Sequence, residues 1–458
     1  MASPMAAQTA QQEADRCVNA SNKFSRDEQI SVCTAAIESG RDTGKKLASD
    51  FNRRGTAYQA KGNIGRALID YNEAIALDPN DASAFNNRGN VYFLKKDNDR
   101  AIADFDQAIR LDPNAAYAFN GRGYAYQTKG DLDQAIADYD QAVRLDPSYA
   151  FALNNRGNAF QARGDVDRAI ADYDSAIQFD SNYPIAFNSR GIAYQTKGDL
   201  DRAIADYDQA IRLDSGYVHA FSHRCHAYVL KGDLDRAIAD CSQAIRLAPD
   251  AVDFNNRAVA YQARGDKDQA FADFDQAIRI DPRDSTAYNG RGLVWQARGD
   301  LDRAIADYSE TILLDSSNAF AFNNRGRAYA AKKDYDRAIT DFTRAIQLAP
   351  KFAVALNGRG MVYQAKNDLD HAIADYSEAI RLEPRYAQAI NNRGGVHAMR
   401  KDYDQAIADF TEAMRIDPTF AVALYRRGKA KQLKGDLAGG VSDIAAAERL
   451  DPRLPAQR

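Results

Sequence analysis

Apolar and small residues recur along this chain at helical spacing, and the pattern itself repeats at a fixed interval. Within residues 82–115, Phe85 and Tyr92 share one helical face, and Phe105 and Ile109 share the face of a second helix. An Asp precedes the second helix where an N-cap belongs, and a Pro follows it in nine of twelve such stretches. Each stretch therefore predicts a helix, a tight turn and an antiparallel helix.

The interval is marked by an Arg followed by a small residue, which occurs twelve times. Ten of the spacings between these Arg residues are 34 residues and one is 33. A fixed period in this range is typical of a stacked solenoid, in which each repeat contacts only its neighbours. We therefore expect residues 48–454 to form twelve repeats of one elongated domain. The marker residues are Arg54, Arg88, Arg122, Arg156, Arg190, Arg224, Arg257, Arg291, Arg325, Arg359, Arg393 and Arg427.

The repeats share a residue pattern that becomes clear when the residue after the Arg is numbered repeat position 8. Position 4 is aromatic or aliphatic, position 11 is mostly Tyr, positions 20 and 27 are mostly Ala, and position 24 is mostly Tyr or Phe. This pattern resembles the bacterial type of tetratricopeptide repeat (TPR). The resemblance implies an all-α, right-handed superhelical solenoid of stacked helix-turn-helix units. It also implies that the first helices line a concave groove that holds proteins or peptides.

The segments outside the twelve repeats are short. Residues 10–47 predict a divergent capping hairpin and linker, because the segment that begins at Cys33 matches the one that begins at Tyr71. We expect residues 1–9 to be a disordered tail and residues 455–458 to be a second tail. The first sixteen residues lack the apolar core of a signal peptide but resemble what remains after one is removed.

Two charged positions do not vary. Position 7 is Arg in all twelve repeats, where the family usually has Leu, and position 23 is Asp in all twelve. An antiparallel hairpin that turns near positions 15–16 brings the two side chains to the same height and flank, so a charge pair within one repeat, or between neighbouring repeats, is expected. Arg88 with Asp104 and Arg156 with Asp172 are examples. We interpret these residues as a structural ion-pair ladder; the alternative is a row of Arg side chains that binds acidic partners.

Amide side chains predict the binding surface. Positions 2, 5, 6, 9, 12 and 13 share the face of the first helix that points away from the second. Asn occupies position 5 in ten repeats and position 6 in five, and Gln occupies position 12 in eight. Amides donate and accept hydrogen bonds, so a row of them can pair with the backbone of an extended peptide. The alternative is that these Asn side chains only tie neighbouring first helices together. The candidate peptide-binding residues are Asn86, Asn87, Asn120, Asn154, Asn155, Asn188, Asn255, Asn256, Asn289, Asn323, Asn324, Asn357, Asn391 and Asn392.

This row of amides is similar to the asparagine ladder in the TPR part of O-linked N-acetylglucosamine transferase. It does not resemble the carboxylate clamp of chaperone-binding TPR proteins, which needs Lys and Arg on the same face. The resemblance implies a groove that recognises peptide backbone.

The four cysteines form two pairs of equal separation. Cys17 and Cys33 are 16 residues apart, and so are Cys225 and Cys241. The second pair occupies positions 8 and 24, which face each other across a hairpin, and the first pair fits the same template. We predict the disulfides Cys17–Cys33 and Cys225–Cys241, which place the protein in the periplasm or outside the cell. The alternative is a cytoplasmic protein with small buried thiols.

Three of the five histidines lie in the sixth repeat, beside its Cys and next to the one shortened interval. His219, His223 and His226 occupy groove positions 2, 6 and 9. Histidines at such spacing can bind Zn²⁺ or Cu²⁺, or make peptide binding depend on pH near 6–7. The third interpretation is an ordinary polar groove lining.

The composition of the chain excludes some classes of partner but does not indicate a functional site. The net charge is −4, from 60 basic and 64 acidic residues without a block of one sign, so we expect neither nucleic acid nor a membrane surface as partner. No run of about 18 apolar residues predicts a transmembrane helix. No catalytic constellation emerges, and we expect no cofactor.

The sequence thus predicts a non-enzymatic scaffold that binds an extended peptide or protein segment in its groove. One alternative is the substrate-recruiting arm of a glycosyltransferase-type enzyme whose catalytic part lies elsewhere. Another is a structural solenoid that associates end to end through an apolar C-terminal face.

Overall fold

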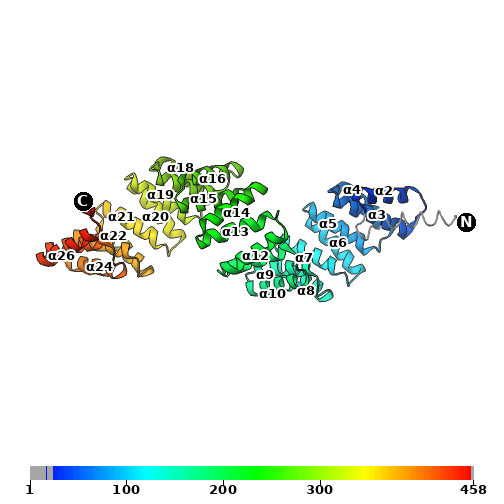
Figure 1. Ribbon diagram of the computed structural model, residues 1–458, viewed down its shortest axis with the longest axis horizontal. Coiled ribbons are helices and arrows are strands. Elements are labelled where there is room, and N and C mark those ends of the chain that lie inside the picture. The colour runs from blue at the N-terminus through cyan, green and yellow to red at the C-terminus, as the bar shows by residue number, and fades with distance from the viewer. Residues whose placement is uncertain (1–16, 18–23, 455–458) are drawn as a thin grey trace. The chain divides into compact units, whose positions relative to one another are not determined.

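The computed structural model describes residue 17 and residues 24–454, and these residues form helices joined by short turns, without a strand (Figure 1). The predicted tails at 1–9 and 455–458 lie outside the described residues, as does part of the predicted N-terminal hairpin. The all-α prediction is confirmed.

The chain divides into two compact bodies, residues 1–227 and residues 228–458, and the division falls inside α13 (Val218–Lys231). Each body is a series of α-hairpins. The N-terminal body contains α2 (Arg26–Glu38), α3 (Gly44–Ala60), α4 (Ile64–Leu77), α5 (Ala82–Leu94), α6 (Asn98–Leu111), α7 (Ala116–Lys129), α8 (Leu132–Leu145), α9 (Ala150–Ala162), α10 (Val166–Phe179), α11 (Pro184–Thr196) and α12 (Leu200–Leu213).

The C-terminal body continues the same alternation of first and second helices. It contains α14 (Leu234–Leu247), α15 (Ala251–Arg264), α16 (Lys267–Ile280), α17 (Ser285–Ala297), α18 (Leu301–Leu314), α19 (Ala319–Ala331), α20 (Tyr335–Leu348), α21 (Ala353–Ala365), α22 (Leu369–Leu382), α23 (Ala387–Met399), α24 (Tyr403–Ile416), α25 (Ala421–Lys434) and α26 (Leu437–Leu450). Odd numbers from α3 onward are the first helices of repeats.

Local sequence explains where each second helix begins. The turn before it contains one residue with positive φ, which is a Gly such as Gly130 (φ 85°), a Lys such as Lys96 (φ 62°) or, once, Asn367 (φ 61°). The next residue is an Asp, or Asn63 before α4, and in most repeats it caps the helix: the Asp97 carboxylate accepts the backbone N–H of Arg100 at 3.2 Å. The predicted N-cap is therefore confirmed.

The repeats stack because their small and aromatic positions interlock. In the fourth repeat Ala169, Tyr173 and Ala176 of α10 are fully buried. A Cβ added to Gly157 of α9 would lie 2.6 Å from Cε1 of Tyr173, so this ring packs directly against the backbone at position 8. The seventh repeat is an exception, because Ala258 packs with Phe274 there. The Arg-Gly marker of the sequence is thus a packing contact inside each hairpin.

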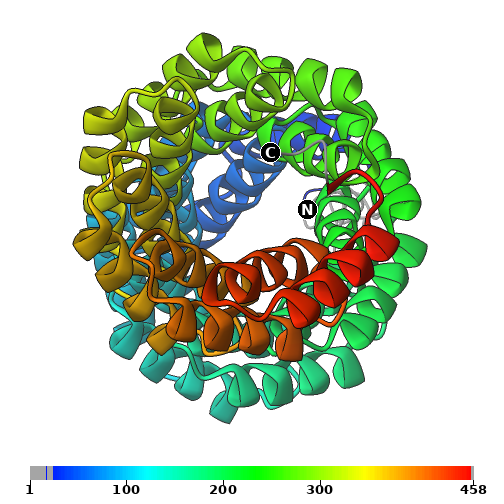
Figure 2. The same ribbon diagram turned by 90° about the vertical axis from the view of Figure 1, so that its left-hand side faces the viewer.

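The first helices form one layer of each body. Along the stack within each body, a first helix contacts the first helices of adjacent repeats, and each second helix contacts the first helix of the following repeat. Among the described residues, second helices do not contact one another. The second helices are therefore spread further apart, and the first helices lie on the inner side of the curved stack that each body forms (Figure 2).

Candidate binding surface

The inner face of the first helices is largely apolar where it reaches solvent. Repeat positions 2, 9 and 13 carry the exposed apolar side chains, and Phe320 is 66% exposed. The amides that the sequence marked as the binding surface lie deeper. The exposed apolar residues are Leu94, Tyr117, Tyr124, Phe151 and Ile185 in the N-terminal body, and Leu230, Val252, Val259, Phe320, Val354, Met361, Met399 and Leu433 in the C-terminal body.

Most Asn side chains at position 5 are buried. Asn154, for example, is 2% exposed, and its Oδ1 accepts no hydrogen bond from the described residues. An Asn at position 6 instead donates Nδ2 to the Oδ1 of position 5 in the preceding repeat. These bonds join Asn87 to Asn52 at 2.9 Å, Asn155 to Asn120 at 3.0 Å, Asn324 to Asn289 at 3.2 Å and Asn392 to Asn357 at 3.1 Å. The amides therefore tie neighbouring first helices together, and their contact with a peptide stays a prediction.

The Gln side chains at position 12 have a structural partner too. In six repeats the buried Tyr at position 24 donates its hydroxyl hydrogen to the Gln Oε1, as Tyr308 does to Gln296 at 2.7 Å. Burial raises the pKa of such a phenol, to about 12 for Tyr71. Three of the Gln Nε2 groups remain available: those of Gln59, Gln127 and Gln296 donate to no residue in the described part of the chain, whereas those of Gln195 and Gln364 contact His226 and Met399.

The residue type at position 6 correlates with the residue type at position 24 of the preceding repeat. This correlation is visible in the sequence only when adjacent repeats are compared. Where position 6 is Gly, position 24 of the preceding repeat is Phe. A Cβ on Gly358 would lie 2.7 Å from Cε1 of Phe342. Where position 6 is Asn, position 24 of the preceding repeat is Tyr, except once, where it is Cys241. The first correlation is steric, because the Phe rings lie against the backbone of the next first helix. Comparing adjacent repeats would have revealed it. The Phe–Gly pairs are Phe105–Gly121, Phe274–Gly290 and Phe342–Gly358.

A cavity of about 660 Å³ opens on the inner face of the C-terminal body. Val354, Met361 and Tyr386 are among its lining residues, and it lies where Ala330 replaces the usual Gln of position 12. Arg327 also lines it, is exposed, and makes no hydrogen bond or ion pair with the described residues. The cavity thus combines apolar walls with one guanidinium that is free to bind an anion.

The charges of the inner face have one sign. The six groove positions contain no Asp or Glu in any of the twelve repeats, and their Arg and Lys residues are Arg53, Arg327, Arg426 and Lys429. Burial lowers the pKa of Arg426. Its guanidinium lies 3.7 Å from where a Cβ on Gly395 would be. This imbalance was visible in the sequence but emerges only when each groove position is read separately.

The predicted Arg–Asp ladder is present in the structure. In eleven repeats the Arg donates Nε and Nη2 to both oxygens of the Asp; for Arg156 and Asp172 these distances are 2.8 and 2.6 Å. The third nitrogen, Nη1, reaches the preceding hairpin, where Asp140 accepts it at 2.8 Å. In the second repeat the Asp104 carboxylate holds the pKa of Arg88 above its usual value. Each Arg therefore joins two helices of its own repeat and the second helix before it.

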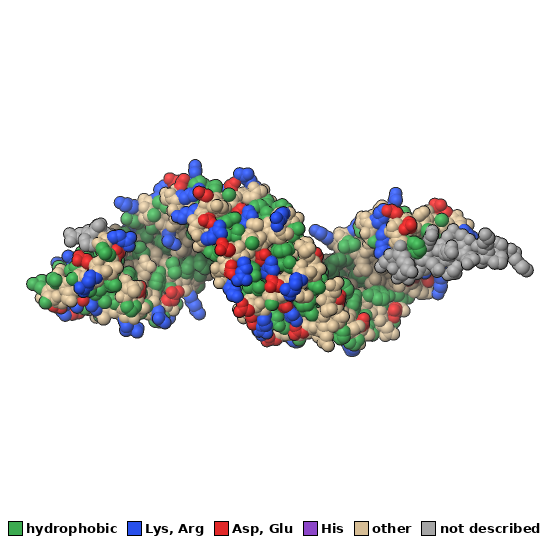
Figure 3. Space-filling model, viewed as in Figure 1, with side chains coloured by type: hydrophobic (Ala, Val, Ile, Leu, Met, Phe, Trp, Pro, Cys, Tyr) green, Lys and Arg blue, Asp and Glu red, His purple; other side chains and the backbone are tan. Residues whose placement is uncertain are grey.

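A second set of charges is exposed and pairs across repeats. Lys129 contacts Asp99 at 2.6 Å, and Lys366 contacts Asp336 at the same distance. On the face shown in Figure 3, Lys and Arg side chains lie beside Asp and Glu side chains. Such pairs contribute little stability individually. They explain why the outer charges leave no uncompensated block.

The three histidines of the sixth repeat lie along α13, with His219 and His223 stacked at 6.5 Å between ring centroids. His223 Nδ1 bonds the Oδ1 of Asn188 at 2.8 Å, and Gln195 Nε2 bonds Nδ1 of His226 at 3.0 Å. Burial lowers the pKa of His223 to about 4, below the range that a sensor near pH 6–7 requires. The described residues contain no group of three His, Cys, Asp or Glu placed to hold a metal ion. These contacts favour a polar lining.

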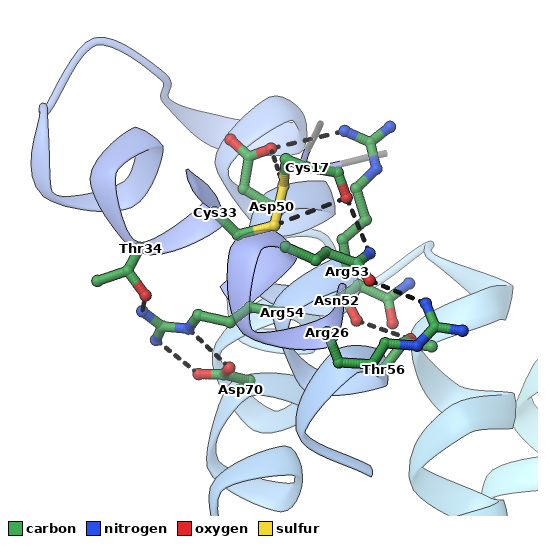
Figure 4. The surroundings of a disulfide bond; sticks show 11 residues. Cys17, Arg26, Cys33, Thr34, Asp50, Asn52, Arg53, Arg54, Thr56 and Asp70 are labelled. Carbon is green, nitrogen blue, oxygen red and sulfur yellow. Dashed lines mark hydrogen bonds and ion pairs between the residues drawn. A yellow bond between two sulfur atoms is a disulfide. The ribbon is translucent and has the colours of Figure 1, made fainter. Parts of the chain in front are cut away.

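The first cysteine pair is a disulfide within the N-terminal body (Figure 4). The Cys17 and Cys33 sulfurs are 2.13 Å apart, both residues are buried, and Gln29 Nε2 donates to the Cys17 carbonyl oxygen at 3.0 Å. Cys225 and Cys241 are also disulfide-bonded. No helix in the described ranges is long and apolar enough to cross a bilayer.

Fold and surface together define an all-α repeat solenoid, a class in which binding takes place on the stacked helix faces. Family models described as TPR repeat match residues 55–96, 89–130, 128–164 and 157–198. Models described as tetratricopeptide repeat match residues 184–217, 223–251, 255–319, 319–352 and 357–419. The chain belongs to the tetratricopeptide repeat family.

One solved structure agrees in fold at low identity, and two others show weaker similarity. The Cut9–Hcn1 hetero-tetramer of the APC/C matches with a TM-score of 0.52 at 14% identity, over 95% of this chain and 92% of that one. A tetratricopeptide repeat protein from Parabacteroides merdae has a TM-score of 0.45 at 22% identity, over 54% and 98%. Yeast Tom70 has a TM-score of 0.42 at 18% identity, over 88% and 92%. No curated protein matches the sequence.

Proposed function

We propose that this protein is a non-enzymatic scaffold that binds an extended segment of another protein along the inner face of its first helices. The TPR fold supports a protein-interaction role in general. The observation that carries the proposal is the exposed apolar face at positions 2, 9 and 13, together with groove charges that are basic only. Exposed apolar surface of this kind marks interaction sites in soluble proteins.

The ligand chemistry follows from the C-terminal body. The cavity beside Val354 and Met361 accepts an apolar side chain, and Arg327 is placed to pair with a carboxylate next to it. A segment that alternates apolar and acidic residues would satisfy both. The partner would thus complement a face that contains no acid of its own.

Amide recognition of the peptide backbone remains part of the proposal in a changed form. The Asn oxygens are bonded or buried, whereas the Nε2 groups of Gln127 and Gln296 are half-buried donors with capacity to spare. Gln127 and Gln296 would donate to backbone carbonyl oxygens of an extended ligand. The ladder is then a row of Gln donors rather than of Asn pairs.

The test uses the full chain and a peptide selected on it from a random 12-residue library. We expect Met361→Glu to weaken binding of that peptide at least tenfold in fluorescence anisotropy, because it places a carboxylate in the apolar cavity. Leu313→Glu is the matched control, since Leu313 lies on the second helix α18 and is 75% exposed. Equal effects of the two variants would show that binding does not use the inner face.

End-to-end self-association is a second candidate. The terminal helix α26 exposes Leu437 (66%), Val441 (60%) and Leu450 (50%). Light scattering after size exclusion should then show oligomers that Val441→Glu dissociates. A monomer at all concentrations would refute this candidate.

We further propose that the protein resides in an oxidising compartment, either the periplasm or the cell exterior, with the cytoplasm as the alternative. The Cys17–Cys33 disulfide supports this location. Four reactive thiols in denatured protein taken from its native compartment would contradict it.

A further inference from the structure

The residue at repeat position 3 differs in the two repeats that follow the cysteine hairpins. In ten repeats this position is a fully buried Ala. The two exceptions are Asp50 and Asp253, and they stand in the repeats that directly follow the hairpins of Cys17–Cys33 and of Cys225 and Cys241. Both carboxyl groups are buried, with 4% and 2% of the residue exposed. A buried Asp therefore occurs where the preceding hairpin holds a disulfide, and nowhere else at this position.

The geometry around Asp50 shows what the carboxyl group faces (Figure 4). Its Oδ1 lies 3.8 Å from Sγ of Cys17 and 3.6 Å from Nη1 of Arg53, and its Oδ2 accepts no hydrogen bond from the described residues. Asp42 is a second carboxyl nearby, and it pairs with Lys46 at 2.7 Å. Burial, followed by a side-chain hydrogen bond with Asp42 and by the negative charge of Asp42, raises the pKa of Asp50 to about 6, against the opposing charges of Arg53 and Lys46.

Disulfide sulfurs carry no proton, so the oxidised pair gives this buried carboxylate no donor. A thiol at Cys17 would be a donor within reach. Because a buried carboxylate without a hydrogen bond is costly, Asp50 favours the dithiol over the disulfide. We propose that Cys17–Cys33 is a reducible thiol–disulfide exchange site in which Asp50 supplies the proton that Cys17 takes up on reduction and then accepts a hydrogen bond from the new thiol.

The exchange step needs a dithiol reductant and balances with it. A reductant thiolate forms a bond to Sγ of Cys33, the Cys17–Cys33 bond breaks, and its electron pair moves to Sγ of Cys17. That sulfur takes the proton of the Asp50 carboxyl group, which stays ionised and accepts a hydrogen bond from the new thiol. The second reductant thiol displaces Cys33 as a thiolate, which is protonated from solvent, and the reductant leaves as a disulfide.

The two sulfurs are buried, so exchange proceeds through local opening of the hairpin and its rate reports that opening. The equilibrium midpoint does not depend on the opening rate and isolates the effect of the carboxyl group. A purely structural explanation is also available: the Asp fills space left by a Cys at position 24, where most repeats carry an aromatic ring. The two explanations differ in whether the midpoint responds to the charge at position 50.

The test is a dithiothreitol redox titration of the full chain, with the oxidation of each cysteine pair measured by alkylation and peptide mass spectrometry. We expect Asp50→Asn, which keeps the volume, to make Cys17–Cys33 at least tenfold harder to reduce, equivalent to about 30 mV for a two-electron couple. The Cys225 and Cys241 midpoint should not change. Asp27→Asn, at an exposed carboxyl of the same hairpin, is the matched control.

Wild-type proton uptake gives a second measurement. Near pH 6 reduction should take up fewer than two protons, because Asp50 loses its proton as Cys17 gains one, and Asp50→Asn should restore two. If Asp50→Asn does not fold by circular dichroism, Asp50→Ala replaces it in both measurements, because Ala is the residue that ten other repeats carry at position 3. Midpoints within twofold of wild type and an uptake of two protons at every pH would overturn the proposal.

Discussion

The Arg–Asp ladder allows its contribution to be measured at a single repeat. Arg156→Ala removes both hydrogen bonds to Asp172 and the bond to Asp140 of the preceding hairpin. The Asp172 carboxylate is 6% exposed, so it would be left as a buried charge without its counter-ion. Breaking such a pair costs roughly 3–5 kcal/mol. We expect a loss of this size in the local free energy of unfolding of α9 and α10.

Hydrogen exchange of the native protein is the suitable assay, because a solenoid opens locally and does not unfold in two states. Arg168→Ala is the control in the same hairpin: its pair with Asp165 is exposed, with 59% of the Arg side chain accessible, and its loss should cost much less than the loss of Arg156. Arg156→Met with Asp172→Leu removes both charges and should cost less than Arg156→Ala. If the double variant is less stable than the single one, the ladder acts through packing and not through its charges.

Three further predictions concern the same architecture. Gly157→Ala should destabilise the fourth repeat by about 1–3 kcal/mol in hydrogen exchange, because its methyl group meets the ring of Tyr173; unchanged exchange in α9 and α10 would contradict that contact. Tyr308→Phe should lower the local stability of α17 and α18 by about 1 kcal/mol through the lost bond to Gln296, and unchanged exchange in these helices would contradict a contribution from that bond. The pKa of His223 in the folded state, about 4, lies below its unfolded value. The unfolded chain therefore binds more protons between pH 6.5 and 4, and stability falls as pH falls through that window. NMR titration of the His223 ring should show a midpoint well below 6.

How far the binding surface follows from sequence depends on the residue considered. The periodicity placed Asn154 and Gln296 on the first helix, but periodicity does not tell how deeply a side chain lies. Asn154 proved to be 2% exposed, and Gln296 accepts the hydroxyl of Tyr308. Depth depends on the spacing between neighbouring first helices, which the next repeat sets. The exposed apolar residues such as Phe320 become a surface only once that spacing is known.

The sequence by itself determined the helices, their caps, the repeat boundaries, the Arg–Asp pairing and the cysteine pairing, because each depends on contacts within one hairpin. The asparagine ties, the third bond of each Arg and the cavity beside Arg327 were decided only by the tertiary structure. These features arise between repeats, where the side chains of one hairpin meet those of the next. A period of 34 residues fixes what recurs in each repeat, whereas stacking decides which of the recurring groups remain free to bind.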